Sequence, residues 1–471
     1  MVDDTFDVVI IGAGSGGVSL AGDLVDAGRT VALVASGYVG GECPYVACMP
    51  SKSLLRSARG RDEIRTAREH GAASDAVQPD ADDAAWREAV RRRDSVANQR
   101  DDSAEADAIA DKGITVVRGF GRLLGRGQVA VGDRTLHGTH VVLDTGSTPV
   151  VPDIDGLAAV PTWTSDEALS SPERPASLVI LGGGPIGCEL AQAYARFGAD
   201  VTVLDPADRL LPTEDEAIGS LMRDVLEASG VHIELGSTPT SASADASGAH
   251  LTLDSGATLT AERVLIAVGR RPATDGVEVE SAGGSLTDSG AVEVDDHCRA
   301  GDGLWAIGDV TGLAPYTHTA NHQASVVLDA LVGDGTRVVT PDALPRAVYT
   351  DPPAAGTGLT ESQARERGLR IAVAEVDLAS GSRAGAEGEG PLGPQDSSGG
   401  LLRLVADADR GVLVGAAAIG PDADSWMTEA TLAVRAQIPI AVLAEVVRPF
   451  PTFAEAYTLG YRDLLPGVNA R

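Results

Sequence analysis

The chain has 471 residues, of which 43% are hydrophobic and 22% are charged, so it is long enough for about three domains with large buried cores. Its formal net charge of −31 gives an acidic surface that repels nucleic-acid phosphates and anionic membranes, and we attribute it to solubility or to a saline or GC-rich host. Four cysteines are too few for the disulfide framework of a secreted protein, and neither a signal peptide nor a long apolar run is evident. We therefore expect a cytoplasmic protein that binds neither nucleic acid nor membranes.

A strand, a glycine-rich turn, a helix and a second strand are predicted over residues 7–34. In such a unit Gly12 permits the tight turn, Gly14 leaves room for a pyrophosphate, and Gly17 lets the helix pack against the strand. The N-terminus of the helix then faces the phosphates. This context makes the glycine pattern a prediction of dinucleotide binding.

One expected part of this unit is missing. An acidic residue normally ends the second strand and binds the ribose hydroxyls, but Ala35 stands there. Ser36 or a water molecule could hydrogen-bond the ribose instead. We expect the dinucleotide to be retained despite this substitution.

Residues 40–52 read Gly-Gly-Glu-Cys-Pro-Tyr-Val-Ala-Cys-Met-Pro-Ser-Lys, and the Pro and the Ser-x-Ser-Leu-Leu that follow the cysteines read as a helix. One and a half helical turns would bring Cys43 and Cys48 to neighbouring turns, close enough for a disulfide if the first turn is distorted. Gly41 lets the backbone approach a flat ligand, while Lys52 and the helix N-terminus favour a thiolate. The stretch suits a redox dithiol, and two buried structural cysteines are the alternative.

Residues 57–112 are polar and rich in Asp and Arg, and their helical spacing predicts solvated helices without chemistry of their own. Residues 141–149 read as a strand that runs into a Gly/Pro turn, which marks a domain crossover. Thr145 and Gly146 lie in this turn and are candidate cofactor contacts.

A second strand–glycine turn–helix–strand unit is predicted over residues 178–205. This time an acid, Asp205, ends the second strand, where it can accept hydrogen bonds from both ribose hydroxyls and repel a 2′-phosphate. We therefore expect NADH rather than NADPH, although Arg209 keeps NADPH open. The glycines of the turn are Gly182, Gly184 and Gly187. Two such units predict two bound dinucleotides, and a duplicated scaffold with one filled site is the alternative.

Two further strands end in possible cofactor contacts. The strand at residues 264–269 ends at Gly269, and the one at residues 304–309 ends in Asp309, whose carboxylate is well placed for a sugar hydroxyl. The next helix starts at Thr317 and contains His318 and His322 on adjacent turns. Because no carboxylate or cysteine ligand stands at a suitable spacing, we expect no metal site there.

The character of the chain changes at about residue 341, where an α+β domain is predicted, with strands at residues 346–350, 371–376, 401–405 and 412–419 and two helices. Residues 380–400 are rich in Gly, Ser and Pro and are predicted to form a mobile loop. The tail contains Phe450-Pro-Thr-Phe-Ala-Glu455.

Together these segments resemble the class I pyridine nucleotide–disulfide oxidoreductases, which include dihydrolipoamide dehydrogenase, glutathione reductase and mercuric reductase. The resemblance spans essentially the whole chain. It rests on the joint occurrence of G-A-G-S-G-G, G-G-E-C-P-Y-V-A-C-M-P-S-K, G-G-G-P-I-G-C-E, V-G-R-R-P and A-I-G-D-V-T-G. It implies two Rossmann-like domains and a C-terminal α+β domain that forms a homodimer. The implied domains are FAD-binding (1–150 and 271–340), NAD(P)-binding (151–270) and interface (341–471).

The resemblance also assigns roles to the candidate residues. Cys48 would be the flavin-facing sulfur and Cys43 the sulfur that meets the substrate, while Lys52 and Glu189 would form an ion pair near the reactive flavin nitrogen. The helix that carries His318 would point its N-terminus at the flavin ring. The FAD contacts would be Gly12, Gly14, Gly17, Ser36, Gly41, Thr145, Gly146 and Asp309. The NAD(H) contacts would be Gly182, Gly184, Gly187, Asp205 and Gly269.

The tail departs from the family pattern. Thiol-handling members carry His-Pro-Thr-x-x-Glu, and the His reaches across the dimer as the acid/base for the interchange thiol. Here Phe450 replaces that His while Glu455 is kept, and losing a positioned acid/base typically costs roughly 10²–10⁴ in rate. Mercuric reductases lack the His but add a C-terminal Cys pair, which this tail does not have. In 2-ketopropyl-coenzyme M oxidoreductase/carboxylase a Phe replaces the His, but the Glu is also replaced.

We therefore expect a homodimeric FAD enzyme that passes electrons from NADH through flavin to the Cys43–Cys48 disulfide. The acceptor would be a small electrophile or disulfide that needs little proton transfer from the protein. Three alternatives remain: a flavin-direct quinone or dye reductase, an enzyme like 2-ketopropyl-coenzyme M oxidoreductase/carboxylase, and a non-enzymatic redox-sensing flavoprotein.

Overall fold

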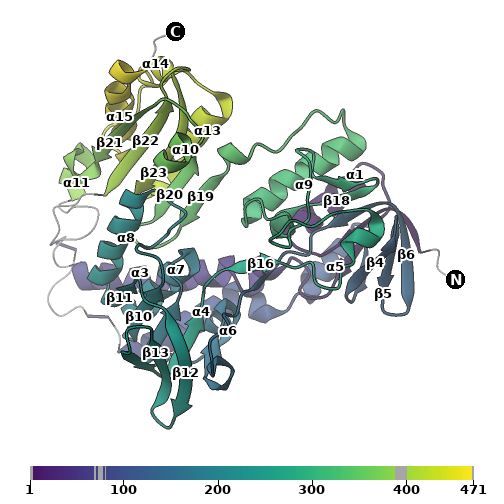
Figure 1. The fold of residues 1–471 in the computed structure, drawn as a ribbon, viewed down its shortest axis with the longest axis horizontal. Helices are drawn as coiled ribbons and strands as arrows, with labels where there is room; N and C mark the ends of the chain where they lie inside the picture. Colours follow the sequence, from purple (N-terminus) through teal and green to yellow (C-terminus); the bar gives the residue numbers. More distant parts are fainter. Residues whose placement is uncertain (1–3, 68–70, 73–77, 80, 388–399, 469–471) are drawn as a thin grey trace. The chain divides into compact units, whose positions relative to one another are not determined.

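The computed structural model describes residues 4–67, 71–72, 78–79, 81–387 and 400–468 (Figure 1). The chain forms two compact units, each assembled from separate stretches of sequence. The first unit comprises Met1–Pro50, Arg92–Val150 and Gly269–Pro341, and the second comprises Ser51–Arg91, Val151–Val268 and Asp342–Arg471. Both units combine helices with sheets, which confirms the predicted α/β class, whereas the division into three domains stays a prediction.

The first unit is built on a largely parallel sheet with the strand order β17-β18-β6-β1-β2-β3. Its opening elements are β1 (Thr5–Ile11), α1 (Ser15–Asp26) and β2 (Val31–Ala35), the strand–helix–strand unit predicted from the sequence. Val8 pairs with Val31 and Ile11 with Val34, so the carboxyl ends of β1 and β2 lie side by side. The other strands on this path are β3 (Thr115–Arg118), β6 (Arg134–Leu143), β17 (Arg299–Gly301) and β18 (Leu304–Ala306).

Alternate residues of β1 enter different cores because successive side chains of a strand point to opposite faces. Val8 and Ile10 pack in a core with helices α1 and α9 (Thr317–Val332), which lie side by side in Figure 1. Val9 and Ile11 pack on the other face, against the hairpin of β4 (Gly121–Gly125) and β5 (Gln128–Val131). Burial on both faces explains why β1 and β2 read as continuous apolar runs.

The second unit contains another parallel sheet, with the strand order β11-β10-β9-β15-β8. Its strands are β8 (Thr162–Trp163), β9 (Ser177–Leu181), β10 (Asp200–Asp205), β11 (Val231–Leu235) and β15 (Arg263–Ile266), and α7 (Pro185–Arg196) and α8 (Glu216–Ala228) connect them. A separate antiparallel sheet consists of β12 (Pro239–Asp245), β13 (Gly248–Leu253) and β14 (Thr258–Ala261). The sequence did not predict this sheet, since β12 is rich in Ser and exposes most of its side chains.

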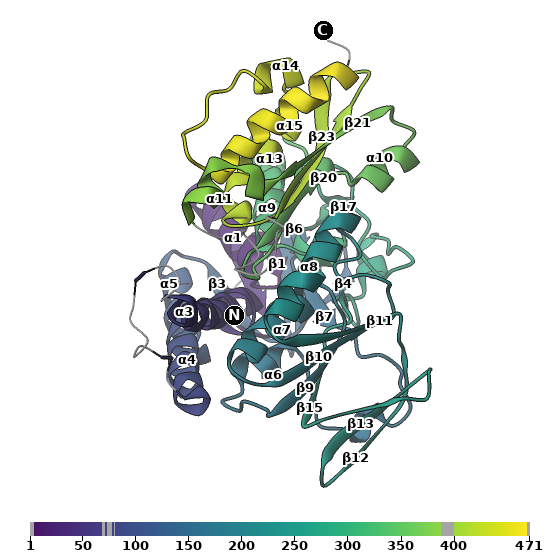
Figure 2. The same cartoon turned by 90° about the vertical axis from the view of Figure 1, so that its left-hand side faces the viewer.

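The C-terminal part of the second unit forms a five-stranded antiparallel sheet with the order β19-β20-β23-β22-β21. Helices α13 (Thr428–Ala436) and α15 (Ala456–Leu464) pack on it, as Figure 2 shows. The strands are β19 (Pro345–Val348), β20 (Ala354–Gly358), β21 (Ile371–Asp377), β22 (Leu401–Asp407) and β23 (Val412–Ile419). β20 was not predicted, because its Ala-Ala-Gly-Thr-Gly sequence lacks branched and aromatic side chains.

Two predictions about polar segments need correction. The loop predicted at 380–400 begins with a helix, α11 (Ser382–Glu387), and residues 388–399 lie outside the described residues. The polar segment before residue 112 does form helices, including α4 (Asp82–Val96), but these are not wholly solvated. Trp86 is buried, and its ring lies 5.1 Å from that of Tyr194.

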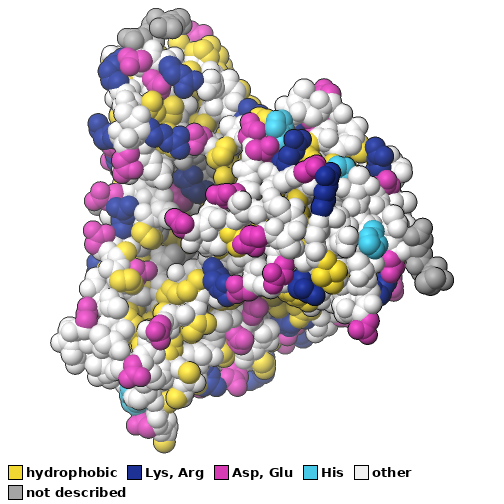
Figure 3. Space-filling view, turned by 45° about the vertical axis from the view of Figure 1, so that its right-hand side comes forward, with side chains coloured by type: hydrophobic (Ala, Val, Ile, Leu, Met, Phe, Trp, Pro, Cys, Tyr) yellow, Lys and Arg dark blue, Asp and Glu magenta, His cyan; other side chains and the backbone are white. Residues whose placement is uncertain are grey.

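In the described part of the chain, no helix has the length and apolar character needed to cross a membrane. Acidic side chains are scattered over the face seen in Figure 3 and are interspersed with Arg and Lys. The net charge is therefore not concentrated in one patch of that face.

Candidate active site

The two cysteines of the Gly-Gly-Glu-Cys stretch lie on different helices. Cys43 is in the short helix α2 (Glu42–Tyr45), and Cys48 is the first residue of α3 (Cys48–Thr66). The helix is interrupted between them, because the backbone leaves the helical conformation at Val46, with φ −134°. The interruption supplies the distortion that a one-and-a-half-turn spacing requires.

One hydroxyl group contacts both sulfur atoms. Thr317, the first residue of α9, donates a hydrogen bond from Oγ1 to Cys43 Sγ at 3.4 Å. The same oxygen lies 3.7 Å from Cys48 Sγ. The sulfurs are thus gathered at one polar group, an arrangement compatible with a redox-active pair. A hydrogen bond to a sulfur also favours its thiolate form.

A polar chain connects this stretch to the end of another strand in the first unit. Arg270 forms an ion pair with Glu42 at 2.7 Å and donates from Nε to Ser147 Oγ at 2.8 Å. Ser147 in turn donates to Asp309 Oδ2 at 2.7 Å. Asp309 is therefore held in a fixed orientation at the carboxyl end of the sheet, where the sequence predicted a carboxylate for a sugar hydroxyl.

The first glycine turn has the form that a dinucleotide phosphate needs. Gly12 has φ +110°, and a Cβ there would lie 2.0 Å from the carbonyl oxygen of Asp144. Gly14 caps α1 without any side-chain hydrogen bond, and the first turn of α1 carries no acidic residue. A Cβ on Gly41 would lie 2.9 Å from Gly14 Cα, so the Gly-Gly pair before Cys43 packs directly on this turn. The N-terminus of α1 is thus suited to an anionic ligand, while one of its amides, the Gly17 N–H, already donates to Asp144 Oδ2 at 2.8 Å.

Orphaned polar atoms in the first unit also fit a large polar cofactor. Thr145 Oγ1 and Thr319 Oγ1 are buried and have no hydrogen-bond partner among the described residues. Gly146, next to Thr145, has φ +77°, a conformation that favours glycine. His318 stacks on Tyr316 with the rings 5.2 Å apart. These features and the glycine turn fit FAD.

At the end of β2, where the ribose acid was expected, Ala35 is buried and Ser36 is exposed. The loop that follows is fixed from other elements. Asp102 accepts from the Val39 N–H at 2.6 Å and forms an ion pair with Arg118 at 2.7 Å. A carboxylate does lie near this loop, but it is supplied by a residue far along the sequence.

The ion pair implied by the resemblance is present in the second unit. Lys52 Nζ lies 2.8 Å from Glu189 Oε2, and Glu189 is buried at the start of α7. The other carboxylate oxygen of Glu189 accepts from the Tyr349 N–H at 2.9 Å. Lys52 Nζ also lies 4.4 Å from the centre of the Tyr349 ring, a cation–π contact. The lysine is thus held by two partners, while its role beside a flavin stays a prediction.

The second glycine turn repeats the construction of the first. Gly182 has φ +110°, Gly184 caps α7 without a side-chain hydrogen bond, and a Cβ on Gly187 would lie 1.9 Å from the Gly182 carbonyl oxygen. Asp205 ends β10, and its carboxylate accepts from the Gly183 N–H at 2.6 Å and the Ala207 N–H at 2.8 Å. The acid is therefore fixed beside the turn, as a ribose ligand would need to be.

Gly269, the other predicted NAD(H) contact, lies in the first unit and has φ +132°, a conformation that favours glycine.

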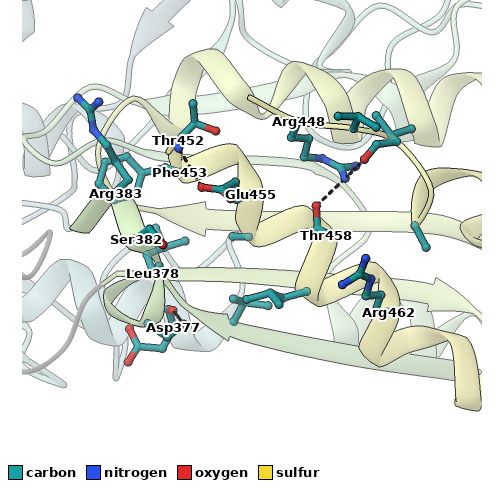
Figure 4. A pocket seen from close by; sticks show the side chains of 18 of the residues that line it. Asp377, Leu378, Ser382, Arg383, Arg448, Thr452, Phe453, Glu455, Thr458 and Arg462 are labelled. Carbon is teal, nitrogen blue, oxygen red and sulfur yellow. Dashed lines mark hydrogen bonds between the residues drawn. The ribbon is translucent and has the colours of Figure 1, made fainter. Parts of the chain in front are cut away.

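Two residues of the tail motif have different environments. Phe450 is 73% exposed, which is unusual for so large an apolar side chain. Glu455 accepts from the Thr452 N–H at 3.1 Å, the contact drawn in Figure 4, and completes a capping box with the Thr452 side chain. Both Thr452 and Glu455 line a cleft of about 650 Å³ formed by residues 376–383 and 444–462.

Sequence reasoning missed some residues of these sites. Thr317 appeared only as the start of a helix, because the hydroxyl is 274 positions from Cys43 in sequence. Tyr349 gave no signal beyond its place in a predicted strand. Asp144 stood in a predicted strand end, but its contact with the glycine turn depends on strand pairing.

The sequence pattern of the family described as pyridine nucleotide-disulphide oxidoreductase matches residues 6–324, and that of its dimerisation domain matches residues 344–460. The dihydrolipoyl dehydrogenase of Bacillus subtilis is 32% identical over 475 residues, covering 96% of each chain. The mercuric reductase of Streptomyces lividans is 31% identical over 472 residues, covering 98% of this chain and 97% of the relative.

Among solved structures, the HOCl-induced flavoprotein disulfide reductase RclA from Escherichia coli, as its Cu(II) complex, has the same fold. It superposes with a TM-score of 0.83 at 29% sequence identity. The match covers 97% of this chain and 99% of the RclA chain. The similarity therefore extends over both units.

Proposed function

The chain belongs to the pyridine nucleotide-disulphide oxidoreductase family, whose members bind FAD and NAD(P)H, and we propose that it is an NADH-dependent reductase of thiophilic metal ions. Bound FAD supplies hydride acceptance from the nicotinamide and two-electron transfer to a disulfide. The residues of this chain provide the cofactor turns, the sulfur pair and the pocket for the acceptor.

We propose that Cys43 and Cys48 bind the metal ion and pass electrons to it. Two thiolates gathered at the Thr317 hydroxyl offer a soft metal ion two sulfur ligands at once. Thr317 can stabilise the thiolate form that such binding requires. Lys52, held by Glu189 and Tyr349, supplies a fixed positive charge one helical turn after Cys48.

The presence of Phe at position 450 is our main reason for proposing a metal ion as the electron acceptor. Reducing a disulfide to two thiols consumes two protons, and the resemblance assigns their transfer to a His at this position. Phenylalanine transfers none, and the neighbouring Arg448 is occupied by Glu429 and Thr458. Reduction of a metal cation consumes electrons alone: two Cu(II) and one NADH give two Cu(I), NAD⁺ and one proton.

The comparisons support the same class of acceptor. One relative is a mercuric reductase, and one structural neighbour is described as a Cu(II) complex of a flavoprotein disulfide reductase. Both ions are soft or borderline and bind thiolates strongly. The dihydrolipoyl dehydrogenase relatives argue for a dithiol substrate instead, and Phe450 is the reason that we do not prefer it.

NADH is the proposed electron donor. The Asp205 carboxylate, fixed by the Gly183 and Ala207 amides, would accept from ribose hydroxyls and repel a 2′-phosphate. Arg209 could favour NADPH, but its Nη2 donates to the Pro212 carbonyl oxygen at 3.0 Å. The guanidinium is thus held on its own loop.

We also propose that the enzyme is a homodimer joined through the matched dimerisation domain. This domain exposes several large apolar side chains, which contact with a second protein would remove from water. They are Leu432, Val442, Val447, Phe450 and Leu459, of which Val447 is 95% exposed. A second copy of the chain would cover this surface and bring Phe450 to the partner's sulfur pair.

The proposal is tested with FAD-loaded protein and NADH under anaerobic conditions, with Cu(II) as acceptor and a Cu(I)-specific chelator as reporter. We expect two Cu(I) per NADH, a long-wavelength charge-transfer band in the NADH-reduced protein, and loss of copper turnover in Cys43→Ser. Quinone reduction that survives Cys43→Ser, without copper turnover, would instead identify a flavin-direct quinone reductase. Slow reduction by both nicotinamides would identify a redox sensor.

A further inference from the structure

Asp144 is a buried carboxyl group placed under the first glycine turn. It directly follows β6, and the residue is only 7% exposed. Its Oδ2 accepts from the Gly17 N–H at 2.8 Å. A Cβ on Gly14 would lie 2.7 Å from the same oxygen. The carboxyl group therefore packs against the N-cap of α1, Gly14, and bonds to an amide in its first turn.

The opposite side of the carboxyl group faces the Gly308-Asp309 turn. A Cβ on Gly308 would lie 2.7 Å from Asp144 Oδ1, so glycine is needed there for the close approach. The charged group that faces Asp144 is Asp309, which has the same sign. The first glycine turn contributes backbone amides, and α9 packs nearby through the uncharged Ala320 and Gln323. An ionised Asp144 would thus be a buried negative charge beside the partly buried carboxylate of Asp309.

The diphosphate of FAD, the expected ligand of this turn, would add to the repulsion between ionised Asp144 and Asp309. The FAD diphosphate carries two negative charges and depends on the amides at the N-terminus of α1. An ionised Asp144 would repel the diphosphate and compete for those amides. A neutral Asp144 keeps its bond from Gly17 and has one O–H to donate. Burial raises the pKa of Asp144 to about 8, in agreement with this requirement.

We propose that Asp144 is a positioning residue for the FAD-binding glycine turn and that it must be protonated for FAD to bind. At a pH above the pKa of Asp144 in the free protein, Asp144 is ionised. FAD binding then requires that Asp144 takes up one proton, so the complex forms from ionised Asp144, one proton and FAD. Asp144 acts through the turn and has no role in electron transfer. The inference rests on FAD binding by the family and not on the proposed acceptor.

The dissociation constant of FAD is measured by flavin fluorescence on deflavinated protein between pH 7 and pH 9. If only the protonated form binds, the apparent constant is the intrinsic one divided by the protonated fraction, so wild-type affinity should weaken roughly tenfold over this range. Asp144→Asn mimics the neutral carboxyl and should show a flat profile. Asp133→Asn, an exposed carboxylate in a turn of the same unit, should follow the wild type.

Parallel pH profiles for the wild type and Asp144→Asn would overturn the proposal. A measurement on the wild type alone covers the case in which the variant does not fold. Calorimetric FAD titration at pH 8.5, in two buffers of different ionisation enthalpy, should show uptake of about 0.8 proton per FAD. The absence of proton uptake would contradict the requirement for a neutral Asp144.

Discussion

Glu455 Oε2 accepts a hydrogen bond from the Thr452 N–H at 3.1 Å, so the acid of the tail motif has a partner within its own turn. The capping box ties the start of η7 (Phe453–Glu455) to the loop that carries Phe450. Glu455 therefore has a structural role in the capping box that does not depend on a His at position 450. It also remains available to orient an imidazole introduced there.

Phe450→His should create dithiol activity that the wild type lacks. The imidazole would supply the acid/base for the interchange thiol, and dihydrolipoamide oxidation should rise by at least roughly tenfold, towards the 10²–10⁴ typical of general acid/base catalysis. The increase in rate stays below the upper end of this range because one carboxylate oxygen of Glu455 already accepts from the Thr452 N–H. Stopped-flow reduction by dihydrolipoamide measures the effect.

NADH reduction of the flavin is the control for this variant and should be unchanged. Adding Glu455→Gln to Phe450→His should remove part of the gain, since the imidazole loses its orienting carboxylate. Vigorous dihydrolipoamide oxidation by the wild type would contradict the premise. No gain, with FAD and dimer intact, would mean that the pocket itself excludes such substrates.

Thr317→Val should raise the pKa of the reduced sulfur pair. The hydroxyl that contacts Cys43 and Cys48 is lost, and a hydrogen bond to a charged group is worth roughly 1.5–3 kcal/mol, which corresponds to about one pKa unit or more. Thiolate absorbance of the reduced holoprotein against pH measures the shift. Thr317→Ser keeps the hydroxyl and should titrate like the wild type. Identical titrations for all three proteins would show that the hydroxyl does not stabilise either thiolate.

Local sequence patterns predicted the glycine turns well because their conformations depend on few residues. Gly12 and Gly182 both have φ +110°, and each turn lies between a buried strand and a helix, as predicted. The acid at Asp205 was placed correctly at a strand end for the same reason. These features need only backbone geometry and residue size.

Contacts between distant segments could not be predicted in this way. The helix break at Val46 places Cys43 and Cys48 on different helices, and Thr317 reaches them from α9. Asp144 meets Gly17 only because β6 pairs with β1 in the sheet. Strand order and register fix these contacts, and a single sequence does not give either directly.

Asp144 also predicts a pH dependence of stability. An aspartate has a pKa near 3.8 in the unfolded chain, and burial raises it to about 8 in the folded protein. The stability contributed by a group of this kind is complete below the lower value and is lost as the pH rises through the higher one. The free energy of unfolding of Asp144→Asn should therefore rise relative to that of the wild type from pH 5 to pH 8, by up to roughly 1.4 kcal/mol per pH unit, and the difference in melting temperature should widen in the same direction.

Every melt is run at the same excess concentration of FAD, so that all samples start as holoprotein. Asp133→Asn should show the pH dependence of the wild type. Curves for Asp144→Asn and the wild type that stay parallel across this range would show that Asp144 does not titrate in it.

The choice of nicotinamide gives a last prediction. Wild-type enzyme should prefer NADH over NADPH by at least roughly tenfold in kcat/KM, about 1.4 kcal/mol, because Asp205 repels a 2′-phosphate. Asp205→Asn removes the charge but keeps an acceptor for the Gly183 N–H, so NADPH should improve while NADH weakens modestly. Arg209→Gln should leave the ratio unchanged, since its guanidinium is bonded to the Pro212 carbonyl oxygen. Equal use of both nucleotides by the wild type, with NADPH activity lost in Arg209→Gln, would show that Arg209 rather than Asp205 decides the preference.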